Sequence, residues 1–230
     1  MVSSGLLNQP SVSHYRLTIH LMMAMLLLAL TMWAAMNRNP RHGPPVRRAG
    51  TTSASRIAML LLTVVTLQIA YGGLVAGLKA GHVSYTWPQM GGALVPEALF
   101  HPGDSSWWAT LTGAAPVVHW IHRWFAFVVL ASVAWLMAVS RNSAVSPVAR
   151  RAVHATAILV GVQIALAVSV LWFHMPLTLA LLHQAVGLAI FTAALVVNHR
   201  LLRDDTGLGL AGGYSARTAA TMASAPPGST

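Results

Sequence analysis

The chain has 230 residues, of which 56% are hydrophobic and only 8% are charged. Such a composition excludes an ordinary soluble domain, which could not cover so much apolar surface in water, and indicates a polytopic membrane protein. The net charge of +10 does not indicate nucleic-acid binding, because the basic residues lie between the apolar stretches rather than in a patch interleaved with aromatic residues. The absence of cysteine excludes disulfides, thiolate metal sites and cysteine nucleophiles.

Five apolar stretches are each long enough to cross a bilayer as a helix. The first, residues 17–36, follows a polar segment, residues 1–16. At a rise of 1.5 Å per residue, about 20 residues span the hydrocarbon core of a membrane. The other predicted spans are 57–78, 117–139, 152–173 and 177–198, with a long loop at 79–116 and a Gly-, Ala- and Ser-rich tail at 199–230. The sequence therefore predicts an all-α protein with five transmembrane helices and a disordered tail.

The distribution of basic residues predicts the orientation in the membrane. The loop 37–56, the loop 140–151 and the tail hold most of the 14 Lys and Arg residues. Segments rich in Lys and Arg stay on the cytoplasmic side. We therefore expect the C-terminus to be cytoplasmic, and the N-terminus and the loop 79–116 to be outside.

Three histidines lie at similar depths in different predicted spans. His20, His122 and His183 are all within about one and a half turns of the outer ends of their helices. A polar ring at membrane depth is costly unless it has a partner or a ligand. Two facing imidazoles at one depth are typical of a bis-histidine haem in a helical bundle. Zinc or copper fits less well, because no carboxylate or thiol lies near this depth.

Several alternatives remain open at this stage. Each histidine could instead bond a neighbouring helix, which predicts a colourless structural membrane protein. His119 precedes His122 by three residues on nearly the same helix face, so either could be the ligand. Arg123 could hold a haem propionate or reach the lipid headgroups. Gly73 and Gly77 could serve tight helix packing or the close approach of a flat cofactor.

The outer loop has two possible roles. Loops as long as 79–116 are often functional, and this one contains His82 and Glu97. Its tryptophans, including Trp107 and Trp108, also suit the membrane interface.

Four motifs, taken in order, resemble one known family, the haem A synthases of respiratory-oxidase assembly. They are VSHYRLTIHL at residues 12–21, YGGLVAGLKAGHVSYTWPQMGG at 71–92, VHWIHR at 118–123 and LLHQAVG at 181–187, followed by NHRL at 198–201. The resemblance extends over nearly the whole chain, and its specificity comes from the order and spacing of the motifs. No single motif would be sufficient.

This resemblance implies a membrane oxidoreductase with eight helices in two four-helix halves. The carboxy-terminal half of the family holds a haem b cofactor, and the amino-terminal half takes haem O and oxidises its ring methyl to the formyl of haem A. Carried over to this sequence, His122 and His183 are the haem b ligands, and His20 belongs to the substrate-side catalytic pair. The implied partners are membrane lipid, haem O synthase and an electron donor, in a bacterial plasma membrane rather than a mitochondrial one. A homo-oligomer is compatible with this picture.

The sequence departs from the family pattern at its start. Met1 matches a position just before the fourth family helix, so we expect an amino-terminally truncated member with a complete haem b half at 57–198 and a His20 without its partner. Lys79 and His119 also depart from the common residues at their positions. Two hypotheses follow: a haem A synthase-like enzyme, or a non-enzymatic single-haem cytochrome or haem-carrying assembly factor.

Overall fold

The computed structural model describes residues 13–38, 53–100, 106–142 and 145–223, with side chains left undescribed at residue 142 and beyond residue 203. Its elements are α1 (His14–Asn37), α2 (Ser53–Gly77), η2 (Ala80–His82), η3 (Glu97–Leu99), α3 (Trp107–Gly113), α4 (Ala115–Asn142), α5 (Pro147–Trp172) and α6 (Leu177–Ala223). Within these ranges the only extended pairing is an isolated bridge between Met90 and Ala93. The all-α prediction is confirmed.

Five of the helices are long and apolar enough to cross a membrane. They are His14–Asn37, Ser53–Gly77, Ala115–Arg141, Pro147–Trp172 and Leu177–Arg203. All five predicted spans are present, and most of them extend a few residues further because the polar residues at their ends remain helical. The protein is a multi-pass membrane protein.

The last helix is longer than the sequence pattern indicated. We expected a disordered tail from residue 199, but α6 continues to Ala223. The expectation is wrong for the backbone of residues 199–223, because no proline interrupts the chain between Pro176 and Pro226 and alanine and leucine favour helix. Residues 224–230 and 1–12, which belong to the predicted tail and outer segment, lie outside the described residues.

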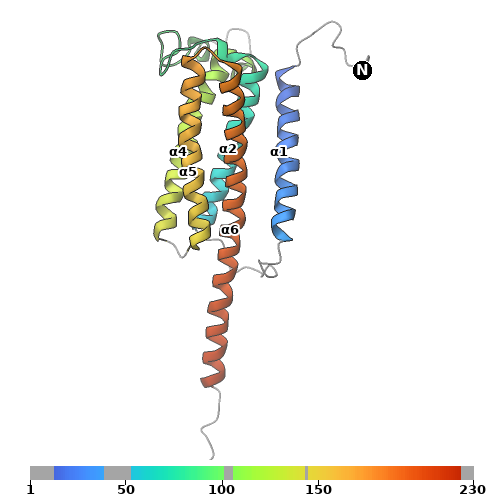
Figure 1. Ribbon diagram of the computed structural model, residues 1–230, viewed down its shortest axis with the longest axis vertical. Helices are drawn as coiled ribbons and strands as arrows, with labels where there is room; N and C mark the ends of the chain where they lie inside the picture. The colour runs from blue at the N-terminus through green and yellow to red at the C-terminus, as the bar shows by residue number, and fades with distance from the viewer. Residues whose placement is uncertain (1–12, 39–52, 101–105, 143–144, 224–230) are drawn as a thin grey trace, which may run out of the picture.

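Four of the long helices form a bundle, and the fifth lies beside it (Figure 1). The most extensive contacts pair α5 with α6 and α2 with α4, and α1 lies mainly against α2. The α2–α4 connection, with its short helices, and the α5–α6 turn lie at one end of the bundle. The α4–α5 connection lies at the other end (Figure 1). This arrangement is the predicted four-helix bundle with one additional helix.

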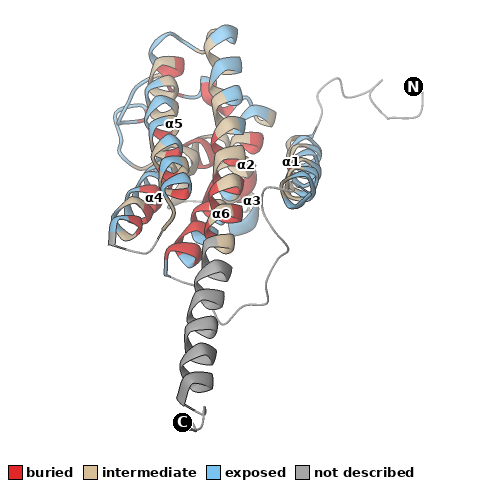
Figure 2. Ribbon diagram, turned by 60° about the horizontal axis from the view of Figure 1, so that its bottom comes forward, coloured by how far each residue is buried: buried red, intermediate tan, exposed pale blue. Residues whose placement is uncertain are grey.

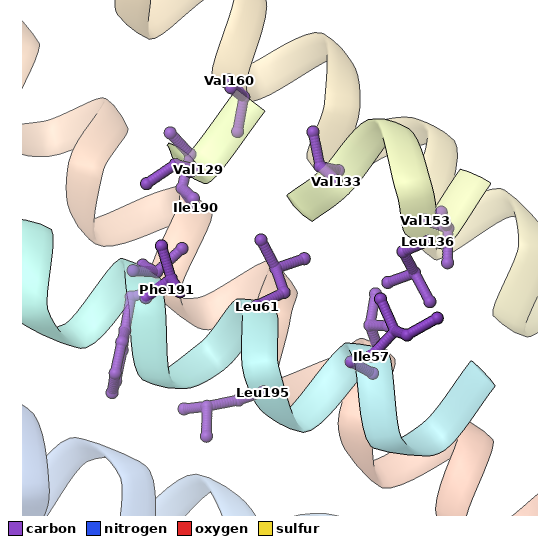
Figure 3. Close-up of a cluster of buried hydrophobic side chains, with 14 of the residues drawn as sticks. Ile57, Leu61, Val129, Val133, Leu136, Val153, Val160, Ile190, Phe191 and Leu195 are labelled. Atoms are coloured by element: carbon purple, nitrogen blue, oxygen red, sulfur yellow. The ribbon is translucent and has the colours of Figure 1, made fainter. Parts of the chain in front are cut away.

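The hydrophobic core fills the half of the bundle nearest the α4–α5 connection. Leu61 of α2, Val133 and Leu136 of α4 and Val153 of α5 are almost completely buried. Figure 3 shows these side chains interdigitating with those of α6. Aliphatic contacts of this kind hold membrane helices together through close packing.

The other half of the bundle is packed differently. No residue in the segments 66–72, 120–128, 161–169 and 177–189 of these four helices is buried. The interior side chains at this level are only partly buried, although the helices continue through it. His122 and His183, which the resemblance gives as haem ligands, lie at this level, whereas the other candidate, His119, is buried just beyond it.

Most of the surface of α1 is exposed, although one face packs against α2 (Figure 2). Met25 is its only buried residue. The approach to α2 depends on glycine: a Cβ at Gly73 would lie 3.0 Å from Thr18 Oγ1, and one at Gly77 would lie 2.6 Å from the Cα of His14. These two glycines therefore serve the helix packing that was one of their two predicted roles.

Hydrogen bonds fix α1 at both ends. Near its start, the hydroxyl groups of Tyr15 and Thr112 are 2.8 Å apart. Near its end, the imidazole of His199 lies 3.0 Å from the side-chain oxygen of Asn37. On the neighbouring turn of α6, the amide of Asn198 donates to the backbone carbonyl of Ala58 at 2.9 Å.

We expect Gly77→Val to displace α1 from the bundle. The added side chain would overlap the backbone of His14, and overpacking of this kind costs about 1–3 kcal/mol. Because the chain lacks cysteine, a single Thr18→Cys reporter can be followed with a membrane-permeant thiol reagent. Its reaction should become several-fold faster in the Gly77→Val background.

The matched control is Gly161→Val on α5, where an added Cβ meets no atom within 4 Å. This variant should leave the reaction of the reporter unchanged. Equal rates in the two valine variants would show that Gly77 does not hold α1 in place.

Candidate functional site

His122 lies on α4 with its ring against α2. A Cβ added at Gly72 would be 3.2 Å from Cε1 of the His122 ring, so the missing side chain makes room for the imidazole. The side-chain amide of Gln68, one turn earlier on α2, donates to the backbone carbonyl of His122 at 2.9 Å. α2 therefore fixes both the backbone and the ring position of this histidine.

His183 lies on α6 and contacts α5 in a related way. Its Nε2 is 3.3 Å from the side-chain nitrogen of Gln163. A Cβ added at Gly187, one turn further along α6, would lie 3.3 Å from that same nitrogen. Gly187 thus gives Gln163 the space to reach His183.

His122 of α4 and His183 of α6 lie in the same half of the bundle, where none of the surrounding helix residues is buried. The rings of His122 and His183 are close enough to interact electrostatically. Each ring also lies near the backbone carbonyl of a glutamine, Gln68 for His122 and Gln163 for His183. Metal-bound histidines commonly use such a carbonyl to orient the ring nitrogen that does not bind the metal.

The two glutamines were not predicted as site residues, although the sequence contains a signal for them. The tripeptide Gln-Ile-Ala occurs at 68–70 in α2 and again at 163–165 in α5. In both helices a small residue, Gly72 or Ala167, follows four positions after the glutamine. A small side chain at that position exposes the glutamine carbonyl to a ring from the neighbouring helix.

Several buried polar atoms near the histidine pair have no hydrogen-bond partner within the described residues. They are Nδ1 of His122, Nδ1 of His183, and the side-chain oxygens of Gln68 and Gln163. Buried polar groups are normally satisfied, and each exception calls for a physical reason. Their concentration around the two histidines is typical of a site that a ligand completes.

The sequence left open whether His119 or His122 binds a metal, and the two rings differ in their hydrogen bonds. Arg123 donates from Nε to Nε2 of His119 at 3.0 Å, which occupies the lone pair of that ring nitrogen. Nδ1 of both rings is buried without a partner in the described part of the chain, so the difference between them is that Nε2 of His119 is already engaged. His119 is also more deeply buried, with 4% of its surface exposed. His122 is therefore the better placed of the two to bind a metal.

Arg123 fastens the outer loop over the histidines. Its guanidinium donates to the backbone carbonyl of Thr86 at 2.7 Å and to that of Ser84 at 2.6 Å. On the same helix, the indole of Trp120 donates to the carbonyl of Leu94 at 2.8 Å. Neither predicted role of Arg123, a propionate contact or an approach to the headgroups, describes these bonds to the loop.

His20 is not part of this arrangement. It is exposed on α1 and makes no hydrogen bond among the described residues. Glu97 is also exposed, at the start of η3, and His82 bonds the hydroxyl of Tyr85 at 2.9 Å. Trp107 and Trp108 are exposed on α3 at the same end of the bundle.

The described residues contain no cluster of three or more His, Cys, Asp or Glu residues that could hold a metal ion. A bis-histidine haem has no need of such a cluster, because the porphyrin supplies four iron ligands and the protein supplies only two. The pair formed by His122 and His183 matches this requirement.

Comparison with known proteins finds a matching family model and several relatives that share one name. The sequence model described as "Cytochrome oxidase assembly protein" matches residues 1–195. The chain is 39% identical over 207 residues to the "Heme A synthase" of Paramagnetospirillum magneticum, covering 88% of this chain and 56% of the relative. It is 41% identical over 191 residues to that of Chelativorans sp., covering 83% of this chain and 51% of the relative.

A third relative, the "Heme A synthase" of Nitrosospira multiformis, is 38% identical over 207 residues, with coverage of 89% of this chain and 57% of the relative. The chain thus spans about half the length of the curated relatives it matches. No solved structure matches the sequence. Because the family model covers most of the residues, including both histidines of the pair, the chain belongs to the cytochrome oxidase assembly protein family.

Proposed function

We propose that this chain binds one haem b between His122 and His183 and takes part in haem A synthesis, in which a ring methyl of haem O is oxidised to the formyl of haem A. The observation that carries the proposal is a histidine on α4 and another on α6, each with a buried Nδ1 unpartnered among the described residues, at a level of the bundle without buried side chains. The names of the relatives support the pathway.

The residues around the pair fit a porphyrin. Gly72 makes room for the ring of His122 and Gly187 for the side chain of Gln163, and the small Ala126 is one turn from His122 on α4. The unpartnered ring nitrogens and glutamine oxygens supply polar contacts that the described protein groups leave unsatisfied. Apolar helix walls suit the body of the macrocycle.

The protein groups have separable tasks in this proposal. His122 and His183 would hold the haem iron, whereas Nε2 of His119 is engaged by Arg123. Gln68 and Gln163 orient the two ligand-bearing helices and rings. Arg123 holds the loop at Ser84 and Thr86 over the outer edge and limits the entry of water. The bound haem supplies one-electron transfer, tuned by its axial ligands and by nearby charge.

The proposal also includes the orientation of the chain in the membrane and its partners. The site faces the outer side of a bacterial plasma membrane, with the C-terminus cytoplasmic, as the basic residues favour. Haem O synthase, an electron donor and, at the level of assembly, a second copy of the chain are the partners to test.

The proposal is tested by producing the full chain with and without haem O synthase. The purified protein should show a b-type reduced-minus-oxidised spectrum, and membranes containing both proteins should yield haem A on extraction. A colourless protein would refute the haem site and favour histidines that only link helices.

The exposed position of His20 favours a second candidate function, a non-enzymatic single-haem cytochrome or haem carrier. The two candidates share His122 and His183 but differ in the need for a substrate site near α1. A b-type spectrum without haem A, in cells that make haem O, would support the cytochrome and reject catalysis by this chain alone.

A further inference from the structure

A basic cavity lies at the end of the bundle opposite the histidine pair. It has a volume of about 550 Å³ and is lined by Val145, Pro147, Arg150, Arg151 and His154. These residues belong to the α4–α5 connection and to the first two turns of α5, at the end of a membrane-spanning helix. From this cavity we infer a binding site for the headgroup of an anionic phospholipid.

The two arginines that line the cavity have no ion pair or hydrogen bond from their guanidinium groups among the described residues, and Nε of Arg150 is buried without a partner. The first turn of α5 contains no acidic residue. A buried guanidinium nitrogen without an acceptor is unfavourable. An anionic oxygen in the cavity would satisfy it.

The start of helix α5 also favours a bound anion. In its first turn the initial proline has no N–H, and Ser146 accepts from the N–H of Ala149 at 3.2 Å and from that of Arg150 at 3.0 Å. The N–H of Val148 is left without a partner among the described residues. The positive end of a helix dipole favours a negative charge, yet the nearest charged side chains here are Arg150 and Arg151. Two cations at this end of a helix require a counter-charge, and a phosphate group provides one in a geometry that arginine binds well.

The chemistry of the lining selects the headgroup. Val145 and Pro147 provide an apolar side, which suits the glycerol and acyl part of a lipid, whereas Arg150, Arg151 and His154 provide the polar side. The cavity lining offers no carboxylate to receive an ammonium or choline group. A net negative headgroup, such as phosphatidylglycerol, therefore fits better than a zwitterionic one.

The experiment uses the purified full chain in an uncharged detergent. Phosphatidylglycerol should raise the unfolding temperature in a saturable way, because a ligand that binds only the folded state stabilises it. Phosphatidylcholine and inorganic phosphate at equal concentration should not. In Arg150→Gln/Arg151→Gln, the phosphatidylglycerol concentration for half the effect should rise by about tenfold or more, the loss expected for one charge-assisted hydrogen bond.

Two further variants keep the test decisive. Arg38→Gln/Arg141→Gln removes two basic residues at the same end of the bundle but outside the cavity, and should respond like the unmodified chain. Arg150→Lys/Arg151→Lys preserves the charge and should bind with intermediate affinity. Equal losses in both glutamine pairs, equal effects of the two lipids, or a full effect of phosphate alone would overturn the assignment. None of these outcomes depends on haem.

Discussion

His122→Ala and His183→Ala should each lower the haem content of the purified protein by about tenfold or more. Loss of a group that merely orients a metal ligand costs about 10–100-fold in metal affinity, so loss of the ligand itself should cost at least as much. Nδ1 of His122 and Nδ1 of His183 are both buried without a hydrogen-bond partner among the described residues, as expected of side chains that await a ligand. Haem content is measured by the pyridine haemochrome spectrum relative to protein.

Two controls separate ligation from folding. His119→Ala and His154→Ala should keep the b-type spectrum, since His119 is bonded by Arg123 and His154 bonds a backbone carbonyl of its own helix at 2.9 Å. His122→Gly should regain a low-spin spectrum when imidazole is added, because the free base can occupy the position of the missing ring. Full haem content in His122→Ala, or its loss in His119→Ala, would assign the iron to the other histidine.

Arg123→Met should lower the midpoint potential of the bound haem by roughly tens of millivolts. Removing a positive charge near the iron favours the ferric state, and nearby charges act strongly in a partly buried site. The same change removes the donors to Ser84 and Thr86, so water should reach the haem more easily, which shifts the potential in the same direction. Redox titration of the purified protein measures the shift.

Arg123→Lys separates the effect of the positive charge from the effect of the hydrogen bonds to the loop. Lysine keeps the charge but cannot present the same fork of donors to His119, Ser84 and Thr86. It should therefore restore most of the potential while the loop at 84–86 stays more sensitive to proteolysis than in the unmodified chain. Arg141→Met, a cation at the opposite end of α4, should change neither property. An unchanged potential in Arg123→Met would remove Arg123 from the haem environment.

The two halves of the bundle differ in how densely they are packed. The half near the α4–α5 connection is filled with aliphatic side chains, and the half near the outer loop holds the histidines, the glutamines and few buried residues. Core substitutions such as Leu136→Ala should then affect folding more than the haem spectrum. This division follows from the chemistry, because a cofactor and a dense aliphatic core cannot occupy the same layer.

The spans and the histidine pair could be predicted from the sequence because both depend on local spacing. Runs of about 20 apolar residues specify membrane helices whatever surrounds them. The depth of His122 and His183 follows from counting residues along two such helices. The extent of α6 beyond residue 198 was missed, because a Gly- and Ser-rich composition weakly favours disorder whereas the absence of proline allows the helix to continue.

By itself, the sequence determined the class of protein, the number of spans and the two residues proposed to bind iron. Only the tertiary structure distinguished His119 from His122 as the candidate ligand, because Arg123 donates a hydrogen bond to the ring of His119 and not to that of His122. It also gave Gln68 and Gln163 their positions, turned Arg123 toward the outer loop and left His20 exposed. Helix periodicity fixes how deep a side chain lies, but which neighbour it meets depends on how the helices rotate and pack against one another.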